Sequence, residues 1–228
     1  MKLYEATVKK LARIILLLTC AILFGCTTKV VVKGYFPTPV VNPLPLTVAV
    51  VYHPDFANYN YIEKDEEREE KEISMGKAQV ELFSTVLESM FEQVIYSKEV
   101  VPTNDDSIDM FFYPMIEEFQ YNMPVETKIN MFEVWIKYHL KVLDAQGNVI
   151  ADWIQTAYGK TPTAMFKSQE KALNEAMIVA LRDVGAGIIL RFNHIPEIKQ
   201  WLKQREQMSA FRISNPKTTI VAAVPPAN

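Results

Sequence analysis

The side chains with the widest range of chemistry in this sequence of 228 residues are two cysteines, Cys20 and Cys26, and three histidines. A thiolate can act as a nucleophile or a metal ligand, and an imidazole as a general base or a metal ligand. The histidines His53, His139 and His194 stand on separate predicted elements, without the spacing of a metal site. The sequence contains no G-x-S-x-G elbow, glycine-rich phosphate loop, H-E-x-x-H or C-x-x-C motif. We therefore expect no enzyme, no cofactor and no metal site.

Cys26 ends a segment with the pattern of an export signal. The segment starts with four basic residues and one acid, which are Lys2, Lys9, Lys10, Arg13 and Glu5. An uncharged apolar run covers residues 14–24, and the small residue Gly25 follows it. A basic start, an apolar run of roughly 7–15 residues and a small residue before the cut are typical of a secretory signal. Because a bilayer core requires about 20 apolar residues, we expect residues 1–25 to be a removed signal peptide rather than a membrane-spanning anchor.

The sequence Leu23-Phe24-Gly25-Cys26 resembles the lipobox of bacterial lipoproteins. In that family the Cys thiol receives a diacylglyceryl group, and the amine freed by cleavage receives a further acyl chain. Two or more chains anchor a protein stably, whereas one gives only marginal binding. The residue after the Cys is Thr27 rather than Asp, so the resemblance implies transfer to the outer membrane. The alternative is that Cys26 is an ordinary thiol after an ordinary signal.

Composition predicts a single packed domain in the processed chain. Removal of residues 1–25 leaves 203 of the 228 residues, which is the size of one large domain. Cys20 leaves with the signal and Cys26 is acylated, so no disulfide is expected, and the 49% hydrophobic content supports a packed core. Loss of four positive and one negative side chain changes the formal charge from −3 to −6. This balance gives no reason to expect nucleic-acid binding, which needs a basic patch.

Three segments are predicted to lie outside the regular elements. Residues 26–45 carry four prolines, which is typical of an extended tether. This tether would connect the lipid to a single domain at residues 46–210. The alternative is that residues 30–32 join the edge of a sheet. The mixed charges of residues 63–72 favour a solvated loop leading into a helix over an acidic docking or cation-binding patch. Residues 211–228 are predicted to be a disordered tail.

The remaining patterns predict an α/β (α+β) two-layer sandwich. A β-branched apolar run predicts a buried strand over 46–52, and apolar spacings of three and four predict helices over 78–94 and 165–192. Runs 108–121, 132–143 and 149–158 predict a three-stranded antiparallel meander, with a turn near Gly147. A short extra helix is predicted over 196–209. The first strand would join the meander through the first helix, and both long helices would pack on one face of the sheet.

One predicted strand face combines a tryptophan with charges. Trp135 occupies one of the alternate positions of its strand that are predicted to face away from the core. Lys137 and His139 lie on the same polar side. Because tryptophan is enriched at binding hot spots, we predict that these three residues contact a partner, with Trp153 nearby across the hairpin. The alternative is that the third helix, through Trp201, covers this face.

The predicted arrangement resembles that of small envelope lipoproteins such as the lipopolysaccharide-assembly lipoprotein. The resemblance rests on the lipobox and on segments 108–112, 143–147 and 172–190. It implies a non-enzymatic accessory protein on the periplasmic face of the outer membrane, bracing a secretion, transport, pilus or flagellar machine. Its partners would be the membrane, through lipid on Cys26, and envelope proteins. The alternatives are a binding module for lipid or another apolar ligand in a groove between helices and sheet, and an envelope hydrolase.

Overall fold

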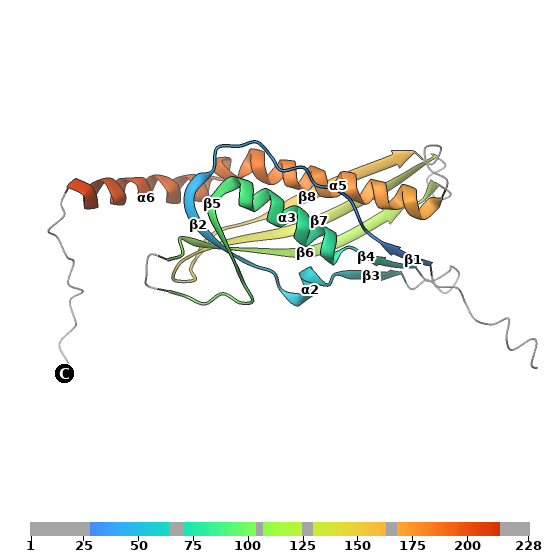
Figure 1. Cartoon of the computed structure of the whole chain (residues 1–228), viewed down its shortest axis with the longest axis horizontal. Helices are drawn as coiled ribbons and strands as arrows, with labels where there is room; N and C mark the ends of the chain where they lie inside the picture. Colours follow the sequence, from blue (N-terminus) through green and yellow to red (C-terminus); the bar gives the residue numbers. More distant parts are fainter. Residues whose placement is uncertain (1–27, 64–70, 104–106, 125–129, 163–167, 215–228) are drawn as a thin grey trace, which may run out of the picture.

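The computed structural model describes residues 28–63, 71–103, 107–124, 130–162 and 168–214. The predicted signal peptide, Cys26, most of the acidic run and the end of the predicted tail lie outside these residues. Within them, two long helices cover one face of a five-stranded sheet, and a smaller three-stranded sheet flanks it (Figure 1). This is the α+β two-layer sandwich predicted from the sequence.

The large sheet has the strand order β5-β2-β6-β7-β8. Strand β2 (Leu44–Val51) lies between β5 (Phe91–Ser97) and β6 (Met110–Asn122) and is parallel to both. Strands β6, β7 (Met131–Asp144) and β8 (Val149–Pro162) form the predicted antiparallel meander. The parallel part of the sheet therefore lies at one side and the meander at the other.

Helix α3 (Gly76–Met90) ends earlier than its apolar pattern predicts. The pattern continues to Val94, but residues 91–97 leave the helix and form β5, which pairs with β2. Val94, Ile95 and Tyr96 favour strands because they are β-branched or aromatic, and the pairing gives their backbone groups hydrogen-bond partners. Helix α3 therefore connects β2 to an added edge strand, rather than directly to the meander.

Helix α5 (Gln169–Arg191) packs along β8 and β7 and beside α3. Its start is capped by Ser168, whose hydroxyl accepts a hydrogen bond from the backbone N–H of Lys171. Two glycines of its sequence, Gly185 and Gly187, are unfavourable within a helix and are compatible with either a close approach to the sheet or an early helix end. The helix continues past both, and Gly187 lies against the Gln155 side chain of β8. A close approach to the sheet is therefore present at Gly187, whereas Gly185 lies against Leu82 and Val86 of α3.

The predicted tether is packed onto the domain from residue 28 onward. Residues Thr28–Val31 form β1, which is parallel to β4 (Lys71–Ser74), while β3 (Asn60–Glu63) completes the small sheet beside the short helix α2 (Pro54–Ala57). We call residues 28–43 the N-terminal strap, because they run from β1 along the helices to β2 (Figure 1).

Specific contacts hold the N-terminal strap in place. Its apolar side chains Val30, Val32 and Phe36 are buried in the main core. The side-chain amide of Asn174 accepts from the backbone N–H of Lys33 at 2.8 Å and donates to its carbonyl at 3.0 Å. The proline pattern correctly indicated extended backbone, and the alternative that residues 30–32 join a sheet edge is confirmed by the pairing of β1 with β4. Because Val30, Val32 and Phe36 are buried, the expectation of a free tether is wrong for residues 28–43.

Helix α6 (Pro196–Ser214) follows a short 3-10 turn, η2 (Phe192–His194), and extends beyond the body of the domain (Figure 1). It continues past the predicted end at residue 209, so residues 211–214 are helical and not part of a disordered tail. Ile198 is buried, and Trp201 packs beside it on the main core. Arg205 forms an ion pair with Asp109. Among the described residues, no helix combines the length and the apolar character needed to cross a bilayer.

Candidate partner-binding surface

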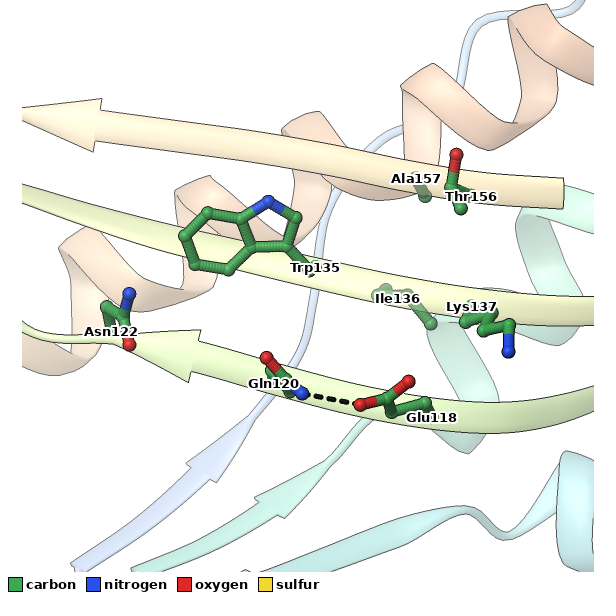
Figure 2. A pocket seen from close by; sticks show the side chains of 8 residues that line it. All are labelled: Glu118, Gln120, Asn122, Trp135, Ile136, Lys137, Thr156 and Ala157. Carbon is green, nitrogen blue, oxygen red and sulfur yellow. Dashed lines mark hydrogen bonds between the residues drawn. The ribbon is translucent and has the colours of Figure 1, made fainter.

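The two faces of the meander have opposite characters. On β7, the six alternate residues predicted to face the core are all buried, and they are Phe132, Val134, Ile136, Tyr138, Leu140 and Val142. The intervening residues, which include Trp135, Lys137 and His139, lie on the face away from α3 and α5. In Figure 2 this face is toward the viewer and the helices lie behind the strands. The predicted grouping of Trp135, Lys137 and His139 on one face is therefore present.

Trp135 is paired with a tyrosine on the neighbouring strand. Its cross-strand partner on β8 is Tyr158, and their ring centroids lie 5.2 Å apart. Trp135 remains 36% exposed in spite of this contact. Beside it, a shallow hollow of about 300 Å³ opens over β6, β7 and β8, with Gln120, Lys137 and Thr156 among its lining residues (Figure 2). We call Trp135, Tyr158, Gln120, Lys137 and Thr156 the Trp135 surface.

Ion pairs hold the charged side chains around this surface. Lys137 Nζ lies 2.8 Å from a carboxylate oxygen of Glu117 on β6, and this contact raises the pKa of Lys137. Farther along the strands, His139 contacts the carboxylate of Asp152, whose other oxygen lies 3.7 Å from Lys141 Nζ. Cross-strand pairs of opposite charge stabilise a sheet modestly, and the pair of Lys137 with Glu117 holds a charged side chain beside Trp135.

Tyr158 is also held by a carboxylate. Its hydroxyl donates a hydrogen bond of 2.6 Å to Glu133, the β7 residue two positions before Trp135. This hydrogen bond is the main cause that raises the pKa of Tyr158 to about 12, since ionisation would place a phenolate beside a carboxylate. Glu133 thus orients the ring against which Trp135 packs.

The hydrogen bond between Tyr158 and Glu133 predicts that the stability of the fold depends on pH at alkaline pH. Because the folded-state pKa of Tyr158 lies above its ordinary value of 10.0, the contact stabilises the fold fully below about pH 10 and loses that effect as the pH rises toward 12. The substitution Glu133→Gln removes the charge and is expected to lower the pKa of Tyr158 toward 10. The ultraviolet absorbance of tyrosinate measures this, with Tyr158→Phe identifying the group. Superimposable titrations of the wild type and Glu133→Gln would contradict the assignment.

Two expectations about neighbouring tryptophans are corrected. Trp153 pairs with the buried Leu140 and therefore faces the helices, where its ring contacts Phe112 and Phe192 edge-on. It does not lie beside Trp135. Trp201 of α6 packs against the main core on the helix side, so the alternative that the third helix covers Trp135 is also wrong.

The sheet face that carries Trp135 is covered by the protein itself at the end farthest from Trp135. Ala49, Val51 and Phe111 form a second, smaller buried cluster, against which Val100 and Ile108 of the connection between β5 and β6 pack. The Trp135 surface lies beyond this cover, toward the end of the sheet where β7 begins.

Within the described ranges, no group of three or more His, Cys, Asp or Glu side chains is placed to hold a metal ion.

No protein-family model and no curated protein matches this sequence. Among solved structures it is similar to a Xanthomonas campestris protein of the DUF330 family, at 12% identity and a TM-score of 0.45, with 81% of this chain and 96% of that chain covered. The minor lipoprotein of Acinetobacter baumannii has 11% identity and a TM-score of 0.40, with 66% and 92% covered. Lipoprotein GNA1162 of Neisseria meningitidis has 11% identity and a TM-score of 0.31, with 66% and 99% covered.

Proposed function

We propose that this protein is a non-enzymatic accessory lipoprotein, anchored through acylated Cys26 to the periplasmic face of the outer membrane. Its Trp135 surface binds an envelope protein that belongs to a secretion, transport, pilus or flagellar machine. The anchor is supported by the basic start, the short apolar run and the lipobox-like sequence ahead of Cys26. The absence of catalytic motifs from the sequence supports a role without chemistry.

The observation that carries the binding proposal is the Trp135–Tyr158 pair, in which Trp135 is exposed and Tyr158 half-buried. Both rings lie on paired strands, and Tyr158 is further held by Glu133, so docking would immobilise few side chains. A rigid aromatic pair reduces the entropy cost of association, and tryptophan and tyrosine are the residue types most often found at hot spots. The charged and polar residues around the pair, such as Lys137 and Gln120, would form the polar rim of such an interface.

The alternative of an apolar ligand between helices and sheet has less support. The facing side chains of α3, α5 and the sheet, among them Phe83, Met177 and Leu181, are buried against one another and fill this interface. A lipid would have to displace these side chains. A protein partner on the opposite face requires no such change.

The test is photocrosslinking in intact cells from a photoactivatable amino acid at Thr156, followed by mass spectrometry. One stoichiometric partner is expected, and Trp135→Ala is expected to weaken its recovery at least about 10-fold, since hot-spot tryptophans contribute about 2 kcal/mol or more. Tyr35→Ala is the matched control, because Tyr35 is an exposed aromatic residue on the N-terminal strap. The same partner recovered equally from Trp135→Ala and wild type would reject this surface. Lipid retained on the purified protein, with no crosslinked protein, would favour the apolar-ligand alternative.

A further inference from the structure

The anchoring residue lies next to the folded domain. Cys26 stands only two residues before Thr28, the first residue of β1. Since consecutive Cα atoms are about 3.8 Å apart, the Cα of Cys26 lies within about 8 Å of the Cα of Thr28. The sequence pattern predicted about twenty residues of tether at this place, and from residue 28 onward the chain is instead part of the domain.

Strand β1 is a firm point of attachment. All four of its residues pair with β4, from Thr28 opposite Lys71 to Val31 opposite Ser74. Val30 is buried in the main core, and Lys29 forms an ion pair of 2.7 Å with Glu72 on β4. The start of β1 is therefore part of the folded domain and cannot move away from it without breaking these contacts.

Contacts between elements define the end of the domain at which β1 begins. Lys71, opposite Thr28, donates a hydrogen bond of 2.7 Å to the sulfur of Met123 just after β6, and its ammonium group lies 6.0 Å from the ring centre of Tyr121. Tyr121 in turn donates a hydrogen bond to Glu63 at the end of β3. The start of α5 lies at the same end, and the turn between β7 and β8 and helix α6 lie at the opposite end (Figure 1).

We infer that the domain stands on the bilayer with the Thr28 end toward the lipid headgroups and α6 pointing away from the membrane. This inference rests on the proposed acylation of Cys26. The short connection of the anchor to a paired strand keeps the Thr28 end close to the headgroups. Electrostatic attraction to anionic lipid does not account for it, because Lys29, Lys71 and Lys171 at this end are matched by Glu63, Glu72 and Glu170. The sequence that joins β3 to β4, residues 64–70, adds five acidic and two basic residues.

The orientation restricts the partner of the Trp135 surface. Trp135 lies four residues along β7 from Met131, which starts the strand at the Thr28 end. At about 3.4 Å per residue, Trp135 is therefore about 14 Å from that end of the sheet. A protein that contacts it must itself lie close to the outer membrane, as an integral outer-membrane protein or a second membrane-anchored protein does.

The test uses the processed, acylated protein in vesicles of phosphatidylethanolamine and phosphatidylglycerol. Its Cys26 sulfur is blocked by lipid, so an introduced cysteine is the unique site for a fluorescent label. Lys171→Cys and Ile62→Cys place the label near the Thr28 end, whereas Gln146→Cys and Lys203→Cys place it at the opposite end, and all four positions are exposed. A lipid with a headgroup-attached quencher is expected to quench the first pair strongly and the second pair not at all. The same difference at high salt would exclude a screened electrostatic cause.

Two controls separate this inference from the proposed function. A flexible Gly/Ser insertion of about 12 residues before Thr28, with an average span of about 20 Å, is expected to abolish the difference between the two ends. Equal quenching at both ends in the chain without the insertion would overturn the orientation, even if the protein floats with the vesicles. If the wild type fails to float, or floats no better than Cys26→Ser, the anchor itself is absent and the proposed function fails with it.

Discussion

Replacing Phe83 by alanine is expected to lower the free energy of unfolding by about 3–5 kcal/mol, as truncation of a fully buried phenylalanine does. Phe83 lies on α3 and is 0% exposed. Its ring centre is 5.3 Å from that of Phe56 on α2 and 5.3 Å from that of Tyr138 on β7, with Phe112 of β6 at 6.5 Å. The truncation would therefore open a cavity where four elements meet, and a loss of this size is a large part of the 5–15 kcal/mol typical of a domain.

Urea unfolding followed by circular dichroism measures this loss on the chain with residues 1–25 removed and Cys26 replaced by serine. Glu81→Ala is the matched control, because Glu81 lies two residues earlier on the exposed face of the same helix and such changes stay within about 0.5 kcal/mol. A loss below about 1 kcal/mol for Phe83→Ala would mean that α3 does not pack on the meander as described.

Replacing Gly159 by alanine is expected to destabilise the fold by about 1–3 kcal/mol or more, through overpacking rather than a cavity. A Cβ atom at this position of β8 would lie 2.0 Å from the carbonyl oxygen of Ala176 and 2.4 Å from the backbone nitrogen of Ala180 on α5. Both atoms belong to the backbone of a helix, so α5 and β8 would have to separate. The neighbouring hydrogen bond of 3.0 Å from the Tyr158 backbone N–H to Asp183 would be strained by the same shift.

Gly187→Ala provides the matched comparison for Gly159→Ala. Its added Cβ would lie 2.5 Å from Gln155 Nε2, which belongs to the end of a side chain rather than to backbone, so Gln155 can shift without separating α5 from β8. Alanine also improves helix propensity by up to about 1 kcal/mol, so a smaller loss of stability than for Gly159→Ala is expected. Equal unfolding midpoints in urea for Gly159→Ala and the wild type would show that β8 and α5 do not approach as closely as this.

The sequence located Trp135 but missed the tyrosine beside it. Alternation along β7 placed Trp135 opposite the buried face, because a strand turns successive side chains to opposite sides. The partner Tyr158 depends on the register of the β7–β8 hairpin, which shifts between Val142 and Leu143. A one-residue shift changes which residues face each other and reverses the face of the second strand, and this is also why Trp153 was expected on the wrong side.

The N-terminal strap and β5 are two elements of the fold whose structure could not be predicted from the local sequence. Prolines and charges in residues 26–45 are compatible with extended backbone, whether it is solvated or packed. Which of the two occurs depends on distant partners, since Asn174 binds the backbone of Lys33 from 141 positions away in the chain. In the same way, residues 91–94 continue a helical pattern locally, and pairing with β2 makes residues 91–97 a strand.

The sequence by itself determined the export-signal pattern, the meander with its buried and open faces, the two long helices and the class of fold. These follow from periodicity, charge and turn residues, which act over a few positions of the chain. Only the tertiary structure decided that the strap is part of the domain, that Tyr158 supports Trp135, and that α6 leaves this face open. Those features arise from contacts between residues far apart in sequence, and no local pattern specifies their geometry.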